Sequence, residues 1–319
     1  MFSVSQDAMK IVRKKILPYV EQLNCRKFNL KNGTTVIDMG TEAPGGWLAA
    51  KLFVEVTIAD LGHVDYGRFQ YGGIDLPSID VYIDHPQIAS LSCQFSSWPM
   101  EKKDIPGYIR PMGSGPARAI AQNDFFVKLW DYVDIQHETV FGLQAEVLPD
   151  EKLADEVASA CRISPENLTI LCCKTGSLAG SINVCSRTIE TTVWRLYHNG
   201  FDIKKIISGM GTCPIAPPVK DEFRAMVRVN VAVLYGGMVR YVVDSTDAEI
   251  EAIIDKLPTK VAKRYGYPFS KMLEEGGRDI FNTDKDIHGV AVFEIMNYNT
   301  GSVFKSGEIR EEYLQEIFF

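Results

Sequence analysis

The chain has 319 residues, of which 46% are hydrophobic and 24% are charged, and this ordinary globular composition is long enough for two domains. The formal net charge of −7 and the lack of a basic stripe exclude a large nucleic-acid-binding surface. No apolar run approaches the roughly 18 residues of a membrane helix, and residues 1–15 lack the pattern of a signal peptide. The sequence therefore predicts a cytoplasmic protein with no membrane partner.

The seven cysteines and five histidines form no recognisable metal or redox motif. The cysteines are odd in number, irregularly spaced and without a C-x-x-C pair, which disfavours a zinc ribbon or a thioredoxin-like site. Cys172 and Cys173 fall in an apolar run, where buried free thiols are expected. No H-x-x-x-H or H-E-x-x-H pattern occurs, so we expect no metal site.

The first third of the chain combines helix and hairpin signals. Hydrophobic residues recur at helical spacing from residue 3 to residue 24, although Pro18 can kink such a helix. Asn32-Gly33 is a hairpin turn signal, because both residues tolerate positive φ. The predicted elements are a helix over 3–24, strands over 28–30 and 34–37, and a helix that follows Gly45-Gly46 and runs through Leu52.

From about residue 79, strand and helix patterns alternate, which is typical of an α/β unit. Asp150 can cap the helix that follows it, and Asn199-Gly200 is a standard helix stop. The predicted elements are a strand over 81–83, a helix over 86–97, a strand over 140–147, a helix from Asp150 to Cys161, a strand over 168–173 and a helix over 183–198.

The last third is more mixed. Its patterns predict a hairpin over 231–235 and 238–243, a helix over 248–257, and a second hairpin over 291–298 and 302–305. The fold class is therefore predicted as α/β (α+β) with two mixed domains. Residues 1–85 with 201–319 are predicted to form a discontinuous α+β domain, and residues 86–200 an α/β domain that carries the candidate site.

Two glycine-containing segments are candidate binding loops. Gly113-Ser114-Gly115 precedes Pro116 and Arg118, so it could present free N–H groups to an anion at a helix N-terminus. A tight turn with a helix cap explains the same pattern. The segment 174–177, followed by Gly180-Ser181, joins a strand to a helix at the strand's carboxyl end, where α/β proteins bind ligands. An ordinary strand-to-helix connection is the alternative.

Arg187 and Glu190 lie three residues apart on one predicted helix face. On an exposed face such a pair is an ordinary ion pair worth a few tenths of a kcal/mol, but apolar neighbours indicate a substantially buried helix. A carboxylate that a guanidinium orients in a pocket can act as a general base.

The segment 213–218 contains three prolines, which predicts an extended wall or linker that cannot be a central strand.

A series of short segments spans nearly the whole chain in a fixed order. They are Gly33-Thr34-Thr35-Val36-Ile37-Asp38, Gly45-Gly46, Asp84-His85-Pro86, 113–119, Leu148-Pro149-Asp150-Glu151, Pro165-Glu166-Asn167, Ser177, Gly180-Ser181, Arg187, Glu190-Thr191, 214–217, Tyr235-Gly236-Gly237 and Pro268-Phe269. Each is weak by itself, but the ordered set resembles the methenyltetrahydromethanopterin cyclohydrolase family.

The resemblance implies a hydrolase of methanogenic one-carbon metabolism. Such an enzyme adds water to a methenyl-tetrahydromethanopterin-type carrier and gives the N5-formyl form, without a metal or another cofactor. The family has two α/β-type domains with a pocket between them and forms homotrimers. By position, Glu190 corresponds to the general base and Arg187 to the residue that holds it. The substrate-binding residues expected are Gly113, Ser114, Gly115, Arg118, Lys174, Ser177, Ser181, Pro214 and Asn230.

The chain departs from the family pattern near the expected pocket. Leu48 replaces an acidic residue, Val231 replaces a carboxylate, and Lys174 adds a cation. These departures motivate two alternatives: a pterin-binding paralogue without catalysis, and a hydrolase that acts on a different pterin. The pair at Arg187 and Glu190 favours retained chemistry.

Overall fold

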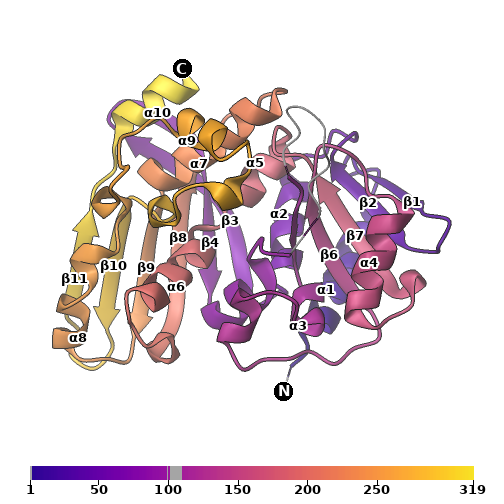
Figure 1. Ribbon diagram of the computed structural model, residues 1–319, viewed down its shortest axis with the longest axis horizontal. Coiled ribbons are helices and arrows are strands. Elements are labelled where there is room, and N and C mark those ends of the chain that lie inside the picture. Colours follow the sequence, from indigo (N-terminus) through magenta and orange to yellow (C-terminus); the bar gives the residue numbers. More distant parts are fainter. Residues whose placement is uncertain (1, 99, 101–109) are drawn as a thin grey trace. The chain divides into compact units, whose positions relative to one another are not determined.

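The computed structural model describes residues 2–98, 100 and 110–319. The chain forms two compact units, and each combines a β-sheet with helices (Figure 1). The first unit contains Met1–Gly62, Ile88–Asn183 and Pro218–Glu222, and the second contains His63–Gln87, Val184–Pro217 and Phe223–Phe319.

The first unit is built on a five-stranded sheet with the order β1-β2-β7-β6-β5. Its three central strands, β2, β7 and β6, run parallel, while β1 and β5 pair antiparallel at the two edges. The strands are β1 (Arg26–Asn29), β2 (Thr35–Gly40), β5 (Met112–Ser114), β6 (Thr139–Gln144) and β7 (Leu168–Cys173). Because β2, β6 and β7 are parallel, their carboxyl ends lie at one edge of this sheet.

Helices cover both faces of the first sheet. Successive residues of β6 point to opposite faces: Phe141 belongs to the core that α4 completes, whereas Gly142 faces Phe53 of α2. Asp150 caps α4 by accepting a hydrogen bond from the Leu153 N–H. The helices are α1 (Val4–Ile11), α2 (Trp47–Thr57), α3 (Ala117–Ala121), α4 (Glu151–Cys161) and α5 (Leu178–Cys185), and α1 continues as a π-helix (Val12–Ile16) and a 3-10 turn (Leu17–Tyr19).

The second unit is built on a six-stranded sheet with the order β11-β10-β9-β8-β4-β3. In this sheet β9 and β10 run parallel, whereas β8 runs antiparallel to both β9 and β4. The strands are β3 (Gly62–Tyr71), β4 (Ile74–Ile83), β8 (Ile206–Pro214), β9 (Met238–Val243), β10 (Val292–Asn297) and β11 (Val303–Gly307). The helices are α6 (Thr188–His198), α7 (Glu222–Gly236), α8 (Asp247–Glu251), α9 (Phe269–Glu275) and α10 (Glu311–Phe318).

Several predicted elements are confirmed. The fold class is α/β with two mixed sheets. The strand over 168–173, the cap at Asp150, and the hairpins formed by β1 with β2 and by β10 with β11 all occur where the sequence predicts them. The predicted helix over 183–198 occurs as two helices, α5 and α6, which are separated at Ser186 and Arg187.

Two predicted elements are wrong. The segment 231–235 belongs to helix α7 and not to a strand. All five of its residues are buried, so tertiary packing on every side overrides the alternation of valines that indicated a strand. The proline segment was expected to stay out of a central strand, yet Cys213 and Pro214 end β8, which lies between β4 and β9. Pro214 is accommodated because it is the last residue of the strand.

The two units also divide the chain differently from the predicted domains. Residues 1–62 pack with 88–183, whereas the prediction joined 1–85 to 201–319. The reason is non-local pairing: β2 pairs with β7, more than a hundred residues later in the chain. The hairpin-forming segment 63–87 belongs to the second unit.

All seven cysteines are free, and the prediction of buried thiols at Cys172 and Cys173 is confirmed. Burial raises the pKa of Cys172 and of Cys161 to about 12, and the thiolate is the nucleophilic form. We therefore expect iodoacetamide at pH 8 to leave the native protein almost unmodified while all seven thiols react in denaturant, as intact-mass measurement would show. Fast labelling of any buried thiol in the native protein would contradict this expectation.

Within the described residues, no helix combines the length and the apolar character needed to cross a membrane.

Candidate active site

Arg187 and Glu190 form a buried ion pair at the start of α6. Arg187 is the residue before the first turn of the helix, and Glu190 lies within that turn. The distance between Arg187 Nη1 and Glu190 Oε2 is 2.7 Å, and the two residues are only 8% and 6% exposed. The positive end of the helix dipole also favours a carboxylate in this turn. The pair therefore combines a carboxylate with two sources of positive potential.

The sheet of the second unit fixes the position of this helix turn. The Tyr241 hydroxyl on β9 lies 2.7 Å from the Thr192 hydroxyl and donates a hydrogen bond to the carbonyl of Ile189. Gly211 on β8 allows Thr188 to approach the strand closely, because a Cβ at this glycine would overlap Thr188 Oγ1. The backbone on which Glu190 sits is thus held from two strands.

Replacing Gly211 by alanine tests this close packing. The added methyl group would push the first turn of α6 away from β8, and we expect a loss of about 1–3 kcal/mol in the free energy of unfolding together with lower turnover. Thr188 Oγ1 makes no hydrogen bond within the described structure, so Thr188→Ala by itself should be mild. In the double variant it should restore part of the stability, as denaturant titration would measure. Strictly additive losses would contradict the proposed overlap.

A second polar cluster lies in the first unit, where its parallel strands end. Gln144, the last residue of β6, donates a hydrogen bond of 2.7 Å to Thr175 Oγ1 and accepts one of 2.7 Å from the Asn183 amide. The Lys174 N–H, just past β7, bonds to the carbonyl of Gly40 at the end of β2. Carboxyl ends of parallel strands are the usual ligand-binding edge of such sheets. Gln144 was not among the site residues predicted from the sequence, although its place at the end of a strand was a usable signal.

Hydrogen bonds within the loop between β7 and α5 hold its conformation. The Ser177 hydroxyl donates a hydrogen bond of 2.7 Å to the Lys174 carbonyl and accepts one of 3.0 Å from the Gly180 N–H. The Gly176 N–H donates to Glu222, whose pKa is raised by burial despite this bond. Lys174 is half-buried and Ser181 is buried. This loop has the predicted position, at the end of a buried strand.

The segment around Gly113, a candidate anion-binding loop, is buried in the first unit. Gly113 and Ser114 belong to strand β5, and a Cβ at Gly113 would overlap the ring of Phe141. Arg118 is fully buried, and its guanidinium forms an ion pair with Asp124. Close packing at Gly113 and the ion pair of Arg118 are structural reasons for the residues found in this segment. The substrate-binding role of Gly113, Ser114, Gly115 and Arg118 stays a prediction.

Pro214 and Asn230 lie in the second unit, as do Arg187 and Glu190. Pro214 is buried at the end of β8. Asn230 lies on α7, where its amide donates a hydrogen bond of 2.7 Å to the Met226 carbonyl. The other predicted site residues belong to the first unit. Across the residues that the structure describes, no group of three His, Cys, Asp or Glu side chains is arranged to hold a metal ion.

Comparisons with known proteins give one consistent result. A sequence model of the family described as cyclohydrolase (MCH) matches residues 3–318. A methenyltetrahydromethanopterin cyclohydrolase of Methanocaldococcus jannaschii is 35% identical over 99% of this chain and 98% of its own length. Proteins of the same name from Methanospirillum hungatei and Methanosarcina barkeri are 33% and 32% identical over 100% of this chain and over 99% and 98% of their own lengths.

Proposed function

The chain belongs to the methenyltetrahydromethanopterin cyclohydrolase family, and on this premise we propose that Glu190 and Arg187 are its catalytic pair. The family's reaction is the hydrolysis of a cyclic amidine in one-carbon metabolism, with a reduced pterin as the carrier. The observation that carries the proposal is the buried ion pair of 2.7 Å at the first turn of α6. It supplies a fixed carboxylate beside a fixed cation.

The substrate needs little activation, because its amidinium carbon bridges two nitrogens and already carries positive charge. Glu190 accepts a proton from water as the water oxygen attacks this carbon. As one C–N bond of the tetrahedral intermediate breaks, its hydroxyl group loses a proton to solvent and becomes the formyl carbonyl on N5, and the departing nitrogen requires a proton. The protonated Glu190 can return its proton there. Water and substrate thus give the formyl product and one proton, and the chemistry calls for no metal or cofactor.

Arg187 positions the base rather than touching the reacting atoms. Its guanidinium holds one carboxylate oxygen of Glu190 and favours the ionised form of that group. The other oxygen can then bind the attacking water. The negative carboxylate also attracts the cationic amidinium, so the same group contributes to binding and to proton transfer.

Arg187→Met should separate positioning from folding. Without the guanidinium the ionised form of Glu190 is less favoured, so the acid limb of the pH–rate profile should move to higher pH while kcat falls. Arg187→Lys is the matched control. It keeps the positive charge, so the acid limb of its pH–rate profile should move less than that of Arg187→Met. Initial rates across pH 5 to 9 measure both effects. An unchanged profile with a lower melting temperature would mean that Arg187 serves only the fold.

The polar cluster of the first unit is proposed to bind the carrier. Lys174 and Ser177 lie on the loop that follows β7, and Ser181 lies in the first turn of α5, which follows that loop. Gln144 lies at the end of the neighbouring strand. An added cation at Lys174 suits an anionic group of the carrier. This assignment is supported by the place of the loop at the carboxyl ends of parallel strands.

The direct test of the function is loss of methenyl-tetrahydromethanopterin absorbance on addition of purified protein. Steady loss that scales with protein concentration, with formation of the N5-formyl product by chromatography, supports the proposal. Binding of the carrier without its conversion would instead identify a pterin-binding protein without turnover. Conversion of another methenyl pterin alone would identify a hydrolase with changed carrier preference.

A cytoplasmic homotrimer is also proposed. Seven free thiols suit a reducing compartment, and the trimer is supported by the resemblance to the family. Light scattering after size-exclusion chromatography tests the assembly: the chain mass is 35.7 kDa, and a trimer would show three times this value.

A further inference from the structure

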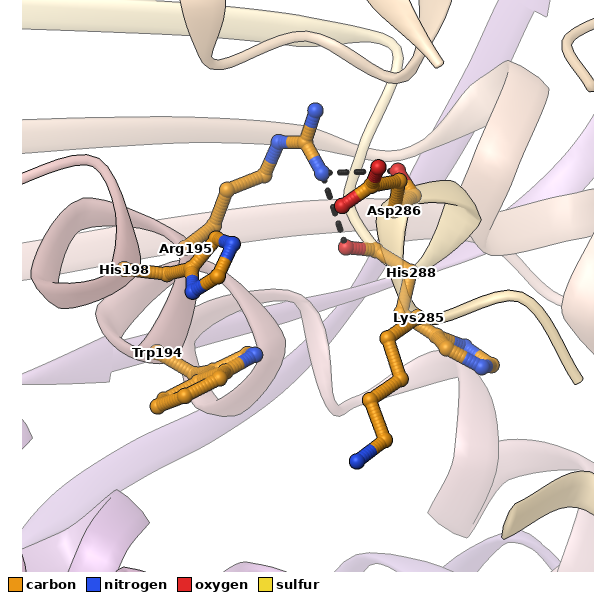
Figure 2. Close-up of a pocket in the computed structure, with 6 residues that line it drawn as sticks. All are labelled: Trp194, Arg195, His198, Lys285, Asp286 and His288. Carbon is orange, nitrogen blue, oxygen red and sulfur yellow. Dashed lines mark hydrogen bonds between the residues drawn. The ribbon is translucent and has the colours of Figure 1, made fainter. Parts of the chain in front are cut away.

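A cavity of about 240 Å³ lies within the second unit, beside the later turns of α6. The catalytic pair lies in the first turn of that helix, and the reaction proposed above uses none of the cavity residues. Figure 2 shows the two walls: α6 supplies one and the segment around the 3-10 turn Lys285–Ile287 supplies the other. The lining residues are Trp194, Arg195, His198, Lys285, Asp286 and His288.

The helix wall offers an aromatic surface. The rings of Trp194 and His198 are one turn apart, with centroids separated by 5.3 Å and planes inclined by 34°. Tyr197 stacks on Trp194 with a centroid distance of 5.8 Å. Planar ligands gain stacking and burial on such a surface.

Arg195 makes this part of the cavity rigid. All of its guanidinium nitrogens donate to main-chain carbonyls, among them those of Asp286 at 2.8 Å and Leu257. These bonds tie α6 to the two segments that flank the cavity. Because its donors are occupied, Arg195 contributes positive potential to the cavity rather than direct contacts with a ligand.

Lys285 supplies a cation without a partner among the described residues, since its ammonium group takes part in no ion pair there. Figure 2 shows this side chain extending opposite the Trp194 ring. His288 is neutral near pH 7, because burial lowers its pKa to about 4, and its Nε2 lies 2.8 Å from the Thr283 hydroxyl. Among the lining residues, two cationic side chains thus face one carboxylate, that of Asp286, while the charge of Asp284 acts on His288 from outside the lining.

We propose that this cavity binds a small planar organic anion, of the aromatic carboxylate class. The ring would lie against Trp194 and His198, and the carboxylate would pair with Lys285. A metal ion does not fit this lining, because the described residues contain no suitable group of three His, Cys, Asp or Glu side chains. The volume suits a single-ring ligand better than a larger one, since pockets for drug-sized ligands are about 300–1,000 Å³.

The probe for the experiment is 4-fluorobenzoate, titrated into the full-length protein and followed by ¹⁹F NMR. Saturable binding should weaken about tenfold in Lys285→Ala, because a charge-assisted contact is lost. Lys263→Ala is the matched control: Lys263 is exposed in the same unit and lies outside the cavity lining. The neutral analogue 4-fluorobenzamide should bind about tenfold more weakly than the carboxylate.

Variants at Trp194 test the aromatic wall. Trp194→Ala should abolish measurable binding, whereas Trp194→Phe keeps a planar ring and should retain most of it. Glu190→Gln should bind the probe like wild type, which distinguishes this cavity from the catalytic pair. Three results would overturn the proposal: no saturable binding, equal binding of the benzamide, or equal binding by Lys285→Ala. Weakening by Glu190→Gln alone would overturn it as well, because the probe would then occupy the catalytic site.

Discussion

Glu190→Gln should lower kcat by roughly 10²–10⁴-fold, which is the usual contribution of a general base. Glutamine has nearly the same shape but cannot accept the proton from water at neutral pH. The substitution also removes the negative charge that attracts the cationic amidinium, so KM should rise severalfold. The same absorbance assay measures both constants.

A surface glutamate provides the control for this experiment. Glu249 is exposed and pairs with Lys205, so Glu249→Gln should leave kcat and KM unchanged. Circular dichroism and a melting curve should show that Glu190→Gln is folded, although the ion pair with Arg187 is lost. If the folded variant turns over at the wild-type rate, Glu190 is not the base.

Arg118→Met should lower the free energy of unfolding by about 3–5 kcal/mol, the usual cost of removing one partner from a buried ion pair. Arg118 is fully buried. Its guanidinium donates two hydrogen bonds of 2.9 Å to Asp124, one of 2.8 Å to Ser97 and one of 3.2 Å to the Cys93 carbonyl. Removing it leaves the Asp124 carboxylate buried beside an apolar side chain. Urea denaturation followed by tryptophan fluorescence measures the change.

Two comparisons make this result specific. Arg68 forms an exposed pair with Asp75, and Arg68→Met should cost less than about 1 kcal/mol. Adding Asp124→Asn to Arg118→Met should restore part of the stability, because the stranded charge is removed. If Arg118→Met instead leaves the stability unchanged and raises KM, that result would support the substrate-binding role predicted for Arg118 from the sequence.

Local patterns predicted that Arg187 and Glu190 lie side by side. Arg187 and Glu190 are three residues apart, so helical geometry by itself brings their side chains together, and the structure confirms the contact. Buried strand β7 and the cap of α4 are likewise set by neighbouring residues. These features depend on periodicity and capping, which a single sequence displays directly.

Features that depend on distant partners could not be predicted in the same way. Gln144 meets Asn183 only because β6 and β7 pair and α5 folds back onto them. The valine-rich stretch of α7 alternates like a strand, and only its packing in the second unit makes it helical. The burial of Arg118 similarly depends on Asp124, whose contact with it no local pattern indicates.

The division of the chain between the units has a consequence for its synthesis on the ribosome. The hairpin of β1 and β2 emerges early, but its neighbour β7 follows more than a hundred residues later. At about 5–20 residues per second, β2 waits for several seconds with an unpaired edge. The nascent first unit is complete only when residues 218–222 have emerged, after part of the second unit. A single cut in the gene therefore cannot separate the two units: any fragment that contains one complete unit also contains part of the other.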